Sequence, residues 1–299
     1  RSEAKKARKQ SNAAQSPPAA AQASTPPPEK EKSLPVIKRS DVLKIGAATL
    51  AAWGLSEVVI SGPLSVDAVQ GIGARTHHGE ALSKYEWHMG IDLNKCIGCL
   101  YCVRACQAVN NVAEEEMRWN IVFPERTEDG IDFYMNRPCQ HCQEAPCTRV
   151  CPVGATWVRD DGLVAMDYDR CIGCRYCEVA CPYDVRRFNW KKPEAENLFQ
   201  PQWGEPEIER RERGVVEKCT FCVQRIDRAL ALGLTPGVNM EVSPACVAAC
   251  PVGARVFGNV LDPESPITKF LQEHETFRLR EDWGTEPKVH YVHPQKESA

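Results

Sequence analysis

The sequence is 299 residues long and has a formal net charge of −3 at pH 7, a length that allows one large domain or two modest ones. The charge is unevenly distributed: residues 1–40 hold nine Lys and Arg against three acids, and the remainder holds 28 against 37. This excess of nine acids in the remainder (28 − 37 = −9) argues against a nucleic-acid partner, which would require a basic face.

Residues 1–36 are rich in Ala, Pro, Gln, Ser and Lys and contain almost no bulky apolar side chains. Such a composition cannot bury enough surface to offset the entropy lost on folding. We therefore expect a disordered tail.

Residues 37–68 contain a basic stretch, Lys38–Lys44, followed by an apolar run, Ile45–Ser56. Twelve uncharged residues are too few to span a bilayer but suit the apolar part of an export signal. The basic stretch resembles the twin-arginine signal, with Lys38 in place of the first arginine. The resemblance implies export in the folded state to the periplasmic or extracytoplasmic face, with Val66–Ala68 as a cleavage site. The alternative is a helix that packs on a partner, with the protein on the cytoplasmic face.

Residues 69–90 are predicted to form a linker before the cysteine-bearing body, 91–262. The alternation at Ile91–Leu93 predicts a short strand. Residues 107–138 form an insertion, in which 131–134 predict a second strand.

All sixteen cysteines fall into four sets of four. The third set has the spacing C-x2-C-x2-C-x3-C-P, the bacterial pattern for cysteine ligands of an iron–sulfur cluster. Cys-Ile-Gly-Cys occurs at 96–99 and 171–174, and Cys-Pro-Val-Gly-Ala occurs at 151–155 and 250–254, which indicates an internal repeat. The first set departs from the pattern, because Gln107 replaces the proline. The sets are Cys96, Cys99, Cys102, Cys106; Cys139, Cys142, Cys147, Cys151; Cys171, Cys174, Cys177, Cys181; and Cys219, Cys222, Cys246, Cys250.

Two alternating apolar segments, 155–158 and 163–166, flank an Asp-Gly turn between the second and third sets, and predict a hairpin. A cysteine run, a hairpin and a second run are the parts of a two-cluster ferredoxin. We therefore predict an inner two-cluster unit, 136–190, and an outer unit made of 91–135 and 191–262. The expected fold class is α+β, with tandem two-cluster ferredoxin-like units and insertions.

In a two-cluster ferredoxin the fourth cysteine of each run ligates the cluster of the other run. This rule predicts four ligand groups, each for one [4Fe-4S] cluster. Group 1 is Cys96, Cys99, Cys102 and Cys250; group 2 is Cys139, Cys142, Cys147 and Cys181; group 3 is Cys171, Cys174, Cys177 and Cys151; group 4 is Cys219, Cys222, Cys246 and Cys106.

The remaining segments carry weaker signals. The polar residues 183–218 include the charge run Glu209–Arg213, which is typical of a solvated face or a docking loop. Residues 226–232 predict a short helix that ends at Gly233, and 255–257 predict a strand. Residues 263–299 are expected to lie across the surface. We interpret His141, Trp119 and Trp157 as packing residues beside the clusters rather than reactive groups.

Three motifs resemble a known family: Arg137-Pro-Cys139-Gln-His-Cys142, Asp169-Arg-Cys171-Ile-Gly-Cys174-Arg-Tyr-Cys177 and Lys218-Cys219-Thr-Phe-Cys222. They are similar to motifs of the iron–sulfur subunits of the dimethyl sulfoxide reductase family, across residues 85–292. The polysulfide, thiosulfate, sulfite and tetrathionate reductase branches and the iron–sulfur half of alternative complex III are the most similar. In that complex one cubane is typically a three-iron cluster, whereas all four cysteine sets are intact here.

The resemblance implies an electron-transfer subunit that is not catalytic by itself. Its partners would be a molybdopterin catalytic subunit and an integral membrane subunit that reacts with quinone, or a cytochrome c. A free multi-cluster ferredoxin is the alternative. A structural zinc protein is a remote one, because zinc sites use cysteine pairs and have no need of the third and fourth cysteines of each run. A disulfide framework is a further one, since the cysteine count is even.

Overall fold

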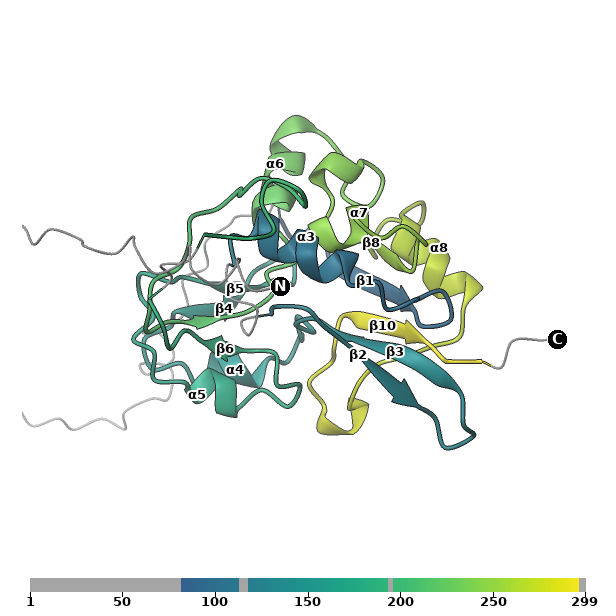
Figure 1. Cartoon of the computed structure of the whole chain (residues 1–299), viewed down its shortest axis with the longest axis horizontal. Coiled ribbons are helices and arrows are strands. Elements are labelled where there is room, and N and C mark those ends of the chain that lie inside the picture. Colours follow the sequence, from purple (N-terminus) through teal and green to yellow (C-terminus); the bar gives the residue numbers. More distant parts are fainter. Residues whose placement is uncertain (1–81, 113–117, 193–195, 296–299) are drawn as a thin grey trace, which may run out of the picture. The chain divides into compact units, whose positions relative to one another are not determined.

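The computed structural model of the chain describes residues 82–112, 118–192 and 196–295. The predicted tail 1–36 and signal segment 37–68 lie outside the described residues. In chain order the main elements are β1 (Trp87–Asp92), α3 (Tyr101–Val109), β2 (Ile121–Arg126), β3 (Asp132–Arg137), α4 (Pro146–Arg149), β4 (Thr156–Val158), β5 (Val164–Met166), α5 (Tyr176–Val179), β6 (Arg187–Phe188), β7 (Val216–Glu217), α6 (Val223–Leu232), η1 (Met240–Val242), α7 (Ala245–Ala248), β8 (Arg255–Asn259), α8 (Pro266–Glu273), β9 (Thr276–Phe277), η2 (Glu281–Trp283) and β10 (Val289–Val292) (Figure 1).

A four-stranded sheet in the order β8-β1-β10-β9 supports the outer cysteine sets. Strand β1 pairs parallel with β10 and antiparallel with β8, while β10 pairs antiparallel with β9. Alternate residues of the two central strands are fully buried, among them Met89 and Ile91 of β1 and Val289 and Tyr291 of β10. These side chains bury apolar area against the rest of the core, which makes the sheet a main source of stability.

The structure corrects two predicted boundaries. The predicted linker 69–90 extends too far, because β1 already begins at Trp87. The predicted surface segment 263–299 supplies β10, which lies inside the sheet, and α8, whose Phe270 packs against Gly90. A four-residue strand becomes buried only through its partners, and those partners are far away in sequence.

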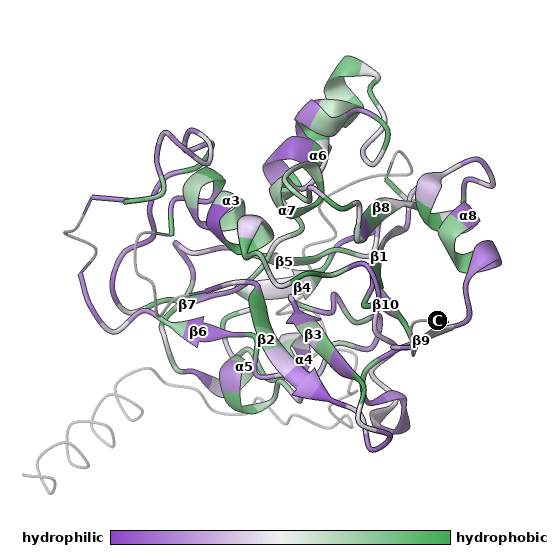
Figure 2. Ribbon diagram, turned by 45° about the vertical axis from the view of Figure 1, so that its right-hand side comes forward, coloured by the Kyte–Doolittle hydropathy of each residue, from purple (hydrophilic) through white to green (hydrophobic). Residues whose placement is uncertain are grey.

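The other strands pair two by two, as β2–β3, β4–β5 and β6–β7. The predicted hairpin at 155–166 is confirmed as β4–β5, with Gly162 at a φ of +79° in its turn. The predicted strand at 131–134 is confirmed as part of β3. Its partner β2 changes from hydrophobic to hydrophilic toward the exposed end of the hairpin (Figure 2).

The predicted helix at 226–232 is confirmed as α6, which begins earlier, at Val223. It ends at Gly233, whose φ of +66° is the left-handed conformation that glycine adopts without a Cβ penalty. The predicted strands at 91–93 and 255–257 correspond to β1 and β8. None of the helices in the described residues combines the length and the apolar composition that crossing a bilayer would require.

Candidate metal centres

The cysteines of groups 1 and 3 come together in two small cavities. All four cysteines of group 1 line one cavity, together with Ile97 and Arg255. All four cysteines of group 3 line the other, together with Ile172 and Val216. In each cavity three cysteines come from one set and the fourth from its pseudo-symmetric partner set. This is the crossed arrangement that a two-cluster ferredoxin requires.

The thiols of groups 2 and 4 also lie near one another. Burial and the neighbouring thiols of Cys139, Cys147 and Cys181 raise the pKa of Cys142 to about 12. Burial, together with the other thiols of group 4, raises the pKa of Cys106 well above its ordinary value. Buried thiolates at these positions therefore need positive charge nearby, which iron and cationic side chains can supply.

Electrostatic interactions between thiols of different groups indicate that the four groups follow one another in a row. Such interactions connect group 1 to group 4, group 4 to group 2, and group 2 to group 3. The interacting pairs are Cys102 with Cys246, Cys219 with Cys139, and Cys177 with Cys147. The groups therefore follow one another in the order 1, 4, 2, 3.

The exposure of the cysteines also varies along this row. All four cysteines of group 4 are buried, and so are three of group 2, with Cys181 partly exposed. Groups 1 and 3 have only one buried cysteine each, and Cys174 of group 3 is exposed. The two ends of the row are thus open to a partner, whereas its middle is shielded from water.

The two Cys-Ile-Gly-Cys loops have the same backbone shape. Gly98 and Gly173 have φ values of +69° and +66°. A Cβ at Gly98 would collide with the ring of Tyr134, and one at Gly173 would collide with the carbonyl oxygen of Gly214. Glycine is therefore required in both loops for its conformation and for close packing.

Backbone and amide groups donate hydrogen bonds to several sulfur atoms. In both Cys-Pro-Val-Gly-Ala repeats the alanine N–H faces the cysteine Sγ: Ala155 to Cys151 at 3.2 Å and Ala254 to Cys250 at 3.3 Å. Asn136 Nδ2 lies 3.2 Å from the Sγ of Cys96. Such hydrogen bonds stabilise thiolate ligands and tune cluster potentials.

Asn110 holds two sulfur atoms of group 4 at once. Its Nδ2 lies 3.6 Å from the Sγ of Cys106 and 3.6 Å from that of Cys222. The N–H of Ala245 approaches the same Cys222 sulfur at 3.4 Å. Because Asn110 is only 1% exposed, its amide is fixed at the end of α3.

Three buried cations face the cysteine groups, and the sequence analysis missed all three. Arg186 Nη2 lies 3.1 Å from the Sγ of Cys147, and Arg255 and Lys218 are each at most 4% exposed. Burial alone would lower the arginine pKa values, but the neighbouring thiolates outweigh burial and raise both above the usual range. A signal was present, because Arg186 and Arg255 each follow the last cysteine of their set by five positions.

His141 is held between the inner and outer units. Its Nδ1 accepts a hydrogen bond from the N–H of Val164 at 3.0 Å, so its Nε2 carries the proton and donates to the carbonyl oxygen of Cys219 at 3.1 Å. Its ring stacks on Phe221 with centroids 3.9 Å apart. Burial and nearby Lys218 lower the pKa of His141 well below its ordinary value. The ring is therefore neutral and serves to pack, as the sequence predicted.

The two tryptophans occupy different environments. Trp119 is 1% exposed and donates from Nε1 to Glu217 at 3.0 Å, under the guanidinium of Arg211. Trp157 lines a larger cavity that also exposes Cys171. Both lie near the cysteine sets, which agrees with a role in excluding water.

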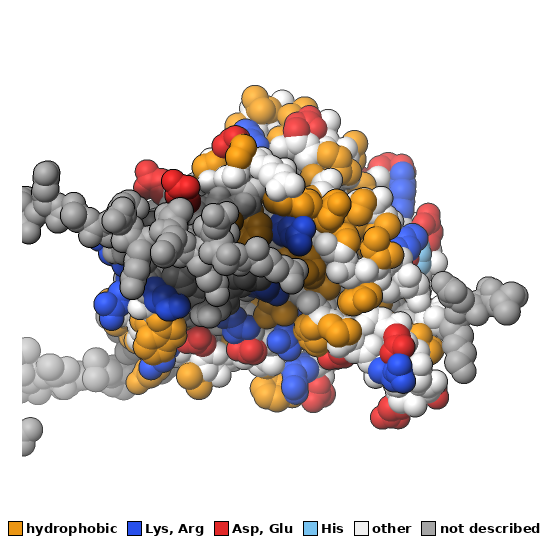
Figure 3. Space-filling view, viewed as in Figure 1, with side chains coloured by type: hydrophobic (Ala, Val, Ile, Leu, Met, Phe, Trp, Pro, Cys, Tyr) orange, Lys and Arg blue, Asp and Glu red, His pale blue; other side chains and the backbone are white. Residues whose placement is uncertain are grey.

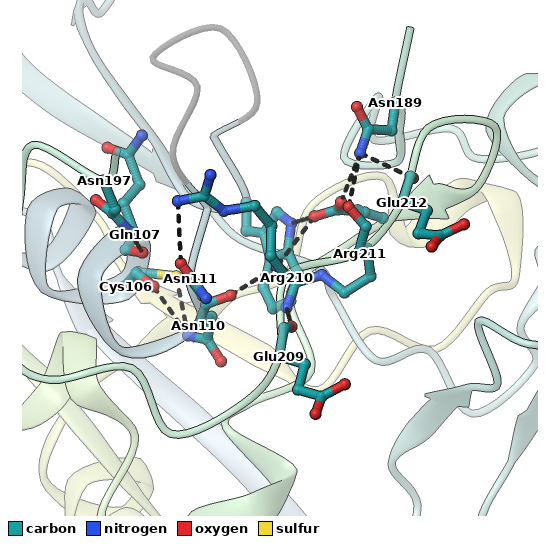
Figure 4. Close-up of polar contacts among 12 residues, drawn as sticks. Cys106, Gln107, Asn110, Asn111, Asn189, Asn197, Glu209, Arg210, Arg211 and Glu212 are labelled. Atoms are coloured by element: carbon teal, nitrogen blue, oxygen red, sulfur yellow. Dashed lines mark hydrogen bonds and ion pairs between the residues drawn. The ribbon is translucent and has the colours of Figure 1, made fainter. Parts of the chain in front are cut away.

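The charge run Glu209–Arg213 is not simply a solvated face. Arg211 is buried, pairs with Glu217 at 3.2 Å and donates to the carbonyl oxygen of Asn110 at 2.6 Å (Figure 4). Asn197 and Gln200 donate to the carbonyl oxygens of the two residues that follow Cys106, at 3.0 and 2.8 Å. This loop therefore caps the end of α3, whose last carbonyls have no partner within the helix.

The donor set fits iron–sulfur clusters. All sixteen cysteines lie in the described residues, and none forms a disulfide. In the same residues no three Cys, His, Asp or Glu side chains converge closely enough to hold a single metal ion. Zinc would draw its thiolates together at Zn–S distances of about 2.3 Å. A cubane takes one thiolate on each of its irons and so holds its four ligands further apart.

Comparisons with known proteins agree with this chemistry. Two family profiles, each described as a 4Fe-4S dicluster domain, match residues 131–197 and residues 95–155 with 170–254. A putative iron-sulfur subunit of dimethyl sulfoxide reductase from Halobacterium salinarum is 41% identical over 218 residues, which cover 68% of this chain and 77% of that protein.

Two further relatives extend the range of complexes. The iron-sulfur cluster-binding subunit of menaquinone reductase from Nitratidesulfovibrio vulgaris is 39% identical, over 70% of this chain and 89% of that subunit. One of the polypeptides of polysulfide reductase from Wolinella succinogenes is 35% identical, over 69% of this chain and 92% of its own length. The chain therefore belongs to the family of iron–sulfur electron-transfer subunits of dimethyl sulfoxide reductase-type complexes, built on tandem 4Fe-4S dicluster domains.

Proposed function

We propose that this protein holds four [4Fe-4S] clusters, one in each ligand group, and relays single electrons along the order 1, 4, 2, 3. The observation that carries the proposal is the single row of cysteine groups with exposed ends and a buried middle. Clusters of this kind accept and release one electron at a time, at potentials set by charge, hydrogen bonds and exposure.

The protein's own residues supply the surroundings that such a relay needs. Buried side chains around groups 4 and 2 exclude water from the middle of the row. Amide N–H groups donate to the sulfur atoms, and the left-handed glycines keep each loop close to its site. None of these residues has to move a proton, so the protein conducts electrons without catalysing a reaction of its own.

The ends of the row are proposed as the points where electrons enter and leave. Ile97 and Tyr101 beside group 1 are 59% and 40% exposed, and Ile172 and Tyr176 beside group 3 are 63% and 61% exposed. Hydrophobic side chains also gather on the face over α3 and α7 (Figure 3). Exposed apolar side chains of this kind are typical of surfaces that a partner covers.

The partners are inferred from the relatives. Their names describe parts of dimethyl sulfoxide, polysulfide and menaquinone reductases. We propose a molybdopterin catalytic subunit at one end of the row and an integral membrane subunit that reacts with quinone, or a cytochrome c, at the other. We place the complex on the periplasmic or extracytoplasmic face, because residues 37–68 resemble a twin-arginine signal.

The first test is the cofactor content of anaerobically purified full-length protein. We expect about sixteen iron and sixteen acid-labile sulfide per polypeptide, with an EPR spectrum of interacting clusters after reduction. About fifteen iron with a three-iron signal would contradict four complete cubanes. Zinc without an EPR signal would overturn the relay itself.

A second test addresses the crossed ligand groups. Cys250→Ala and Cys96→Ala lie far apart in sequence but should perturb the same cluster and give matching EPR spectra. Cys246→Ala, in the same set as Cys250, should perturb a different one. Matching spectra for Cys250→Ala and Cys246→Ala would show that each set ligates its own cluster.

A third test addresses the assembly. Full-length protein with an affinity tag is isolated from membranes of its native host, and the copurifying polypeptides are identified by mass spectrometry. A large molybdopterin-containing polypeptide and a membrane protein are expected, in a fraction released from the outer face. Isolation of the tagged protein alone at every detergent concentration would favour a free ferredoxin.

A further inference from the structure

Three buried cations each act electrostatically on thiols of two successive cysteine groups: Arg255 on groups 1 and 4, Lys218 on groups 4 and 2, and Arg186 on groups 2 and 3. Their positions agree with this, because Arg255 lines the cavity of group 1, Arg186 donates to Cys147 of group 2, and Lys218 donates to the carbonyl oxygen of Cys219 of group 4. All three side chains are nearly or fully buried, with exposed fractions of 4%, 0% and 1%.

Arg255 serves the outer unit. Its strongest electrostatic neighbours are Cys102 of group 1 and Cys246 of group 4. Its Nη2 donates to the side-chain oxygens of Asn120 at 3.0 Å and Asn136 at 2.7 Å. Both hydrogen-bond partners are neutral, so the charge of the guanidinium is not cancelled there.

Arg186 occupies the equivalent place in the inner unit. Its strongest neighbours are Cys147 of group 2 and Cys177 of group 3. Besides the contact with Cys147, its Nη2 donates to the hydroxyl oxygen of Thr156 at 3.0 Å. Thr156 follows the last cysteine of its own set by five positions, as Arg186 does, so the two repeats meet at this hydrogen bond.

Lys218 lies where the two units meet. Its Nζ donates to the carbonyl oxygen of Cys219 at 2.8 Å. The thiols of Cys139 of group 2 and Cys219 of group 4 act on its charge, and so does the guanidinium of Arg186. It immediately precedes Cys219, the first cysteine of the fourth set.

The charges of these three residues are not neutralised by acids. Elsewhere in the protein, a buried arginine pairs with a carboxylate, as Arg159 does with Asp161 and Arg211 with Glu217. Within the part of the protein that the structure describes, Arg186, Arg255 and Lys218 have no Asp or Glu partner. A buried charge is costly unless it is compensated, and the compensation available here is the negative charge of the cysteine groups.

We propose that Arg255, Lys218 and Arg186 are fixed positive charges that stabilise an added electron on either neighbouring cluster. Each pair of successive clusters in the row has one such cation. The inference rests on the proposed four-cluster function. Each transfer moves one electron from a reduced cluster to an oxidised one, and no bond or proton changes place. A fixed positive charge that acts on two clusters favours the reduced state of both and weakens the repulsion between two reduced clusters.

The test is an EPR-monitored redox titration of the purified, fully loaded protein and its variants. Arg186→Gln should disfavour reduction of clusters 2 and 3 only, and Arg255→Gln should disfavour reduction of clusters 1 and 4 only. At a fixed ambient potential the ratio of reduced to oxidised cluster should fall about tenfold, which is about 59 mV for a one-electron couple. Lys218→Met should act on clusters 4 and 2.

Matched variants separate charge from structure. Arg186→Lys and Arg255→Lys keep the charge and should restore most of the potential. Arg126→Gln removes the same charge from the exposed end of the β2–β3 hairpin and should leave all four potentials unchanged. Thr156→Val removes the neutral partner of Arg186 without changing any charge, so its effect should be small.

Asn120→Asp tests Arg255 without removing it. The new carboxylate would lie beside the guanidinium and cancel its field, so reduction of clusters 1 and 4 should become harder although the arginine remains. Unchanged potentials in Asn120→Asp and Arg255→Gln, at full iron content, would overturn the proposal. A uniform shift of all four clusters in either arginine variant would overturn it as well. Low iron in the wild-type protein would instead refute the four-cluster function.

Discussion

The helices α3 and α5 follow the same Cys-Ile-Gly-Cys loop, yet α3 has nine residues and α5 has four. Both begin after a residue in the left-handed conformation, Leu100 and Arg175, so their starts are equivalent. Their ends differ because Cys181 is followed by Pro182, whereas Cys106 is followed by Gln107. Proline disfavours helical backbone at the residue before it and supplies no N–H, so Pro182 prevents α5 from continuing past Cys181 as α3 continues past Cys106.

The end of the longer helix α3 is held by hydrogen bonds from a distant segment of the chain. The carbonyls at the end of α3 accept backbone N–H groups and also side-chain donors from the segment 197–211, namely Asn197, Gln200 and Arg211. The inner unit is built from neighbouring parts of the chain, with the hairpin β4–β5 between its two sets. The missing proline thus leaves the longer helix α3 with an end that depends on long-range polar contacts from the segment 197–211.

Loss of the Arg211–Glu217 ion pair should cause the largest decrease in stability. Arg211→Ala leaves the buried Glu217 carboxylate without its cationic partner, and breaking a buried ion pair in this way costs about 3–5 kcal/mol of unfolding free energy. Urea unfolding of the iron-loaded protein measures this loss of unfolding free energy. Arg213→Ala, an exposed arginine two residues along, is the control. Equal midpoints for both variants would mean that the cap does not stabilise the outer unit.

Exchanging the residue that follows the fourth cysteine of a set, Gln107 or Pro182, tests whether it causes the difference in length between α3 and α5. Gln107→Pro places proline inside α3, where it removes a helix hydrogen bond and clashes with the preceding turn, at a cost of about 3 kcal/mol. Pro182→Ala in the inner unit should cost much less, because α5 has already ended. Thermal unfolding followed by circular dichroism compares them, and a larger loss for Pro182→Ala would contradict our account of the two helices.

A single cap should contribute a smaller amount. Asn197→Ala removes the side-chain donor to the carbonyl of Gln107, which keeps the hydrogen bond from the Val112 N–H. A net loss of about 1 kcal/mol is expected for one buried hydrogen bond. Hydrogen exchange of the α3 amides measures the local effect. The amides of α5, the corresponding helix of the inner unit, serve as the internal control. Uniform acceleration in both helices would indicate global unfolding instead of fraying at α3.

The smallest expected effect is a pH-dependent change in stability caused by His290 in strand β10 of the main sheet. Burial and nearby His88 lower the pKa of His290 to about 4, whereas the unfolded value is about 6.5. Between these values the unfolded chain binds more protons, so stability is full above about pH 6.5 and is lost as the pH falls toward 4.

From pH 7.5 to pH 6 the expected loss due to His290 is about 0.8 kcal/mol. His290→Gln should remove this part of the pH dependence while leaving the strand pairing of β1 and β10 intact. Urea midpoints at the two pH values, for wild type and variant, provide the measurement. The same decrease in both proteins would show that other groups cause it.

The sequence by itself determined the cysteine chemistry and the local elements around it. Three features depend only on short stretches of the chain: the ligand spacing, the hairpin between the second and third sets, and the end of α6 at Gly233. The residues within each stretch are therefore enough to predict it. The crossed ligand groups also follow from spacing, and the structure brings the thiols of each group near one another.

Only the tertiary structure decided which charged residues are buried and which strand completes the main sheet. Arg211 lies in a run of charges that resembles any solvated loop, and Arg186, Arg255 and Lys218 differ from surface cations only in what folds over them. Strand β10 is too short to be recognised apart from its partner β1. Burial is a property of contacts between distant segments, so a linear pattern of residue types cannot specify it.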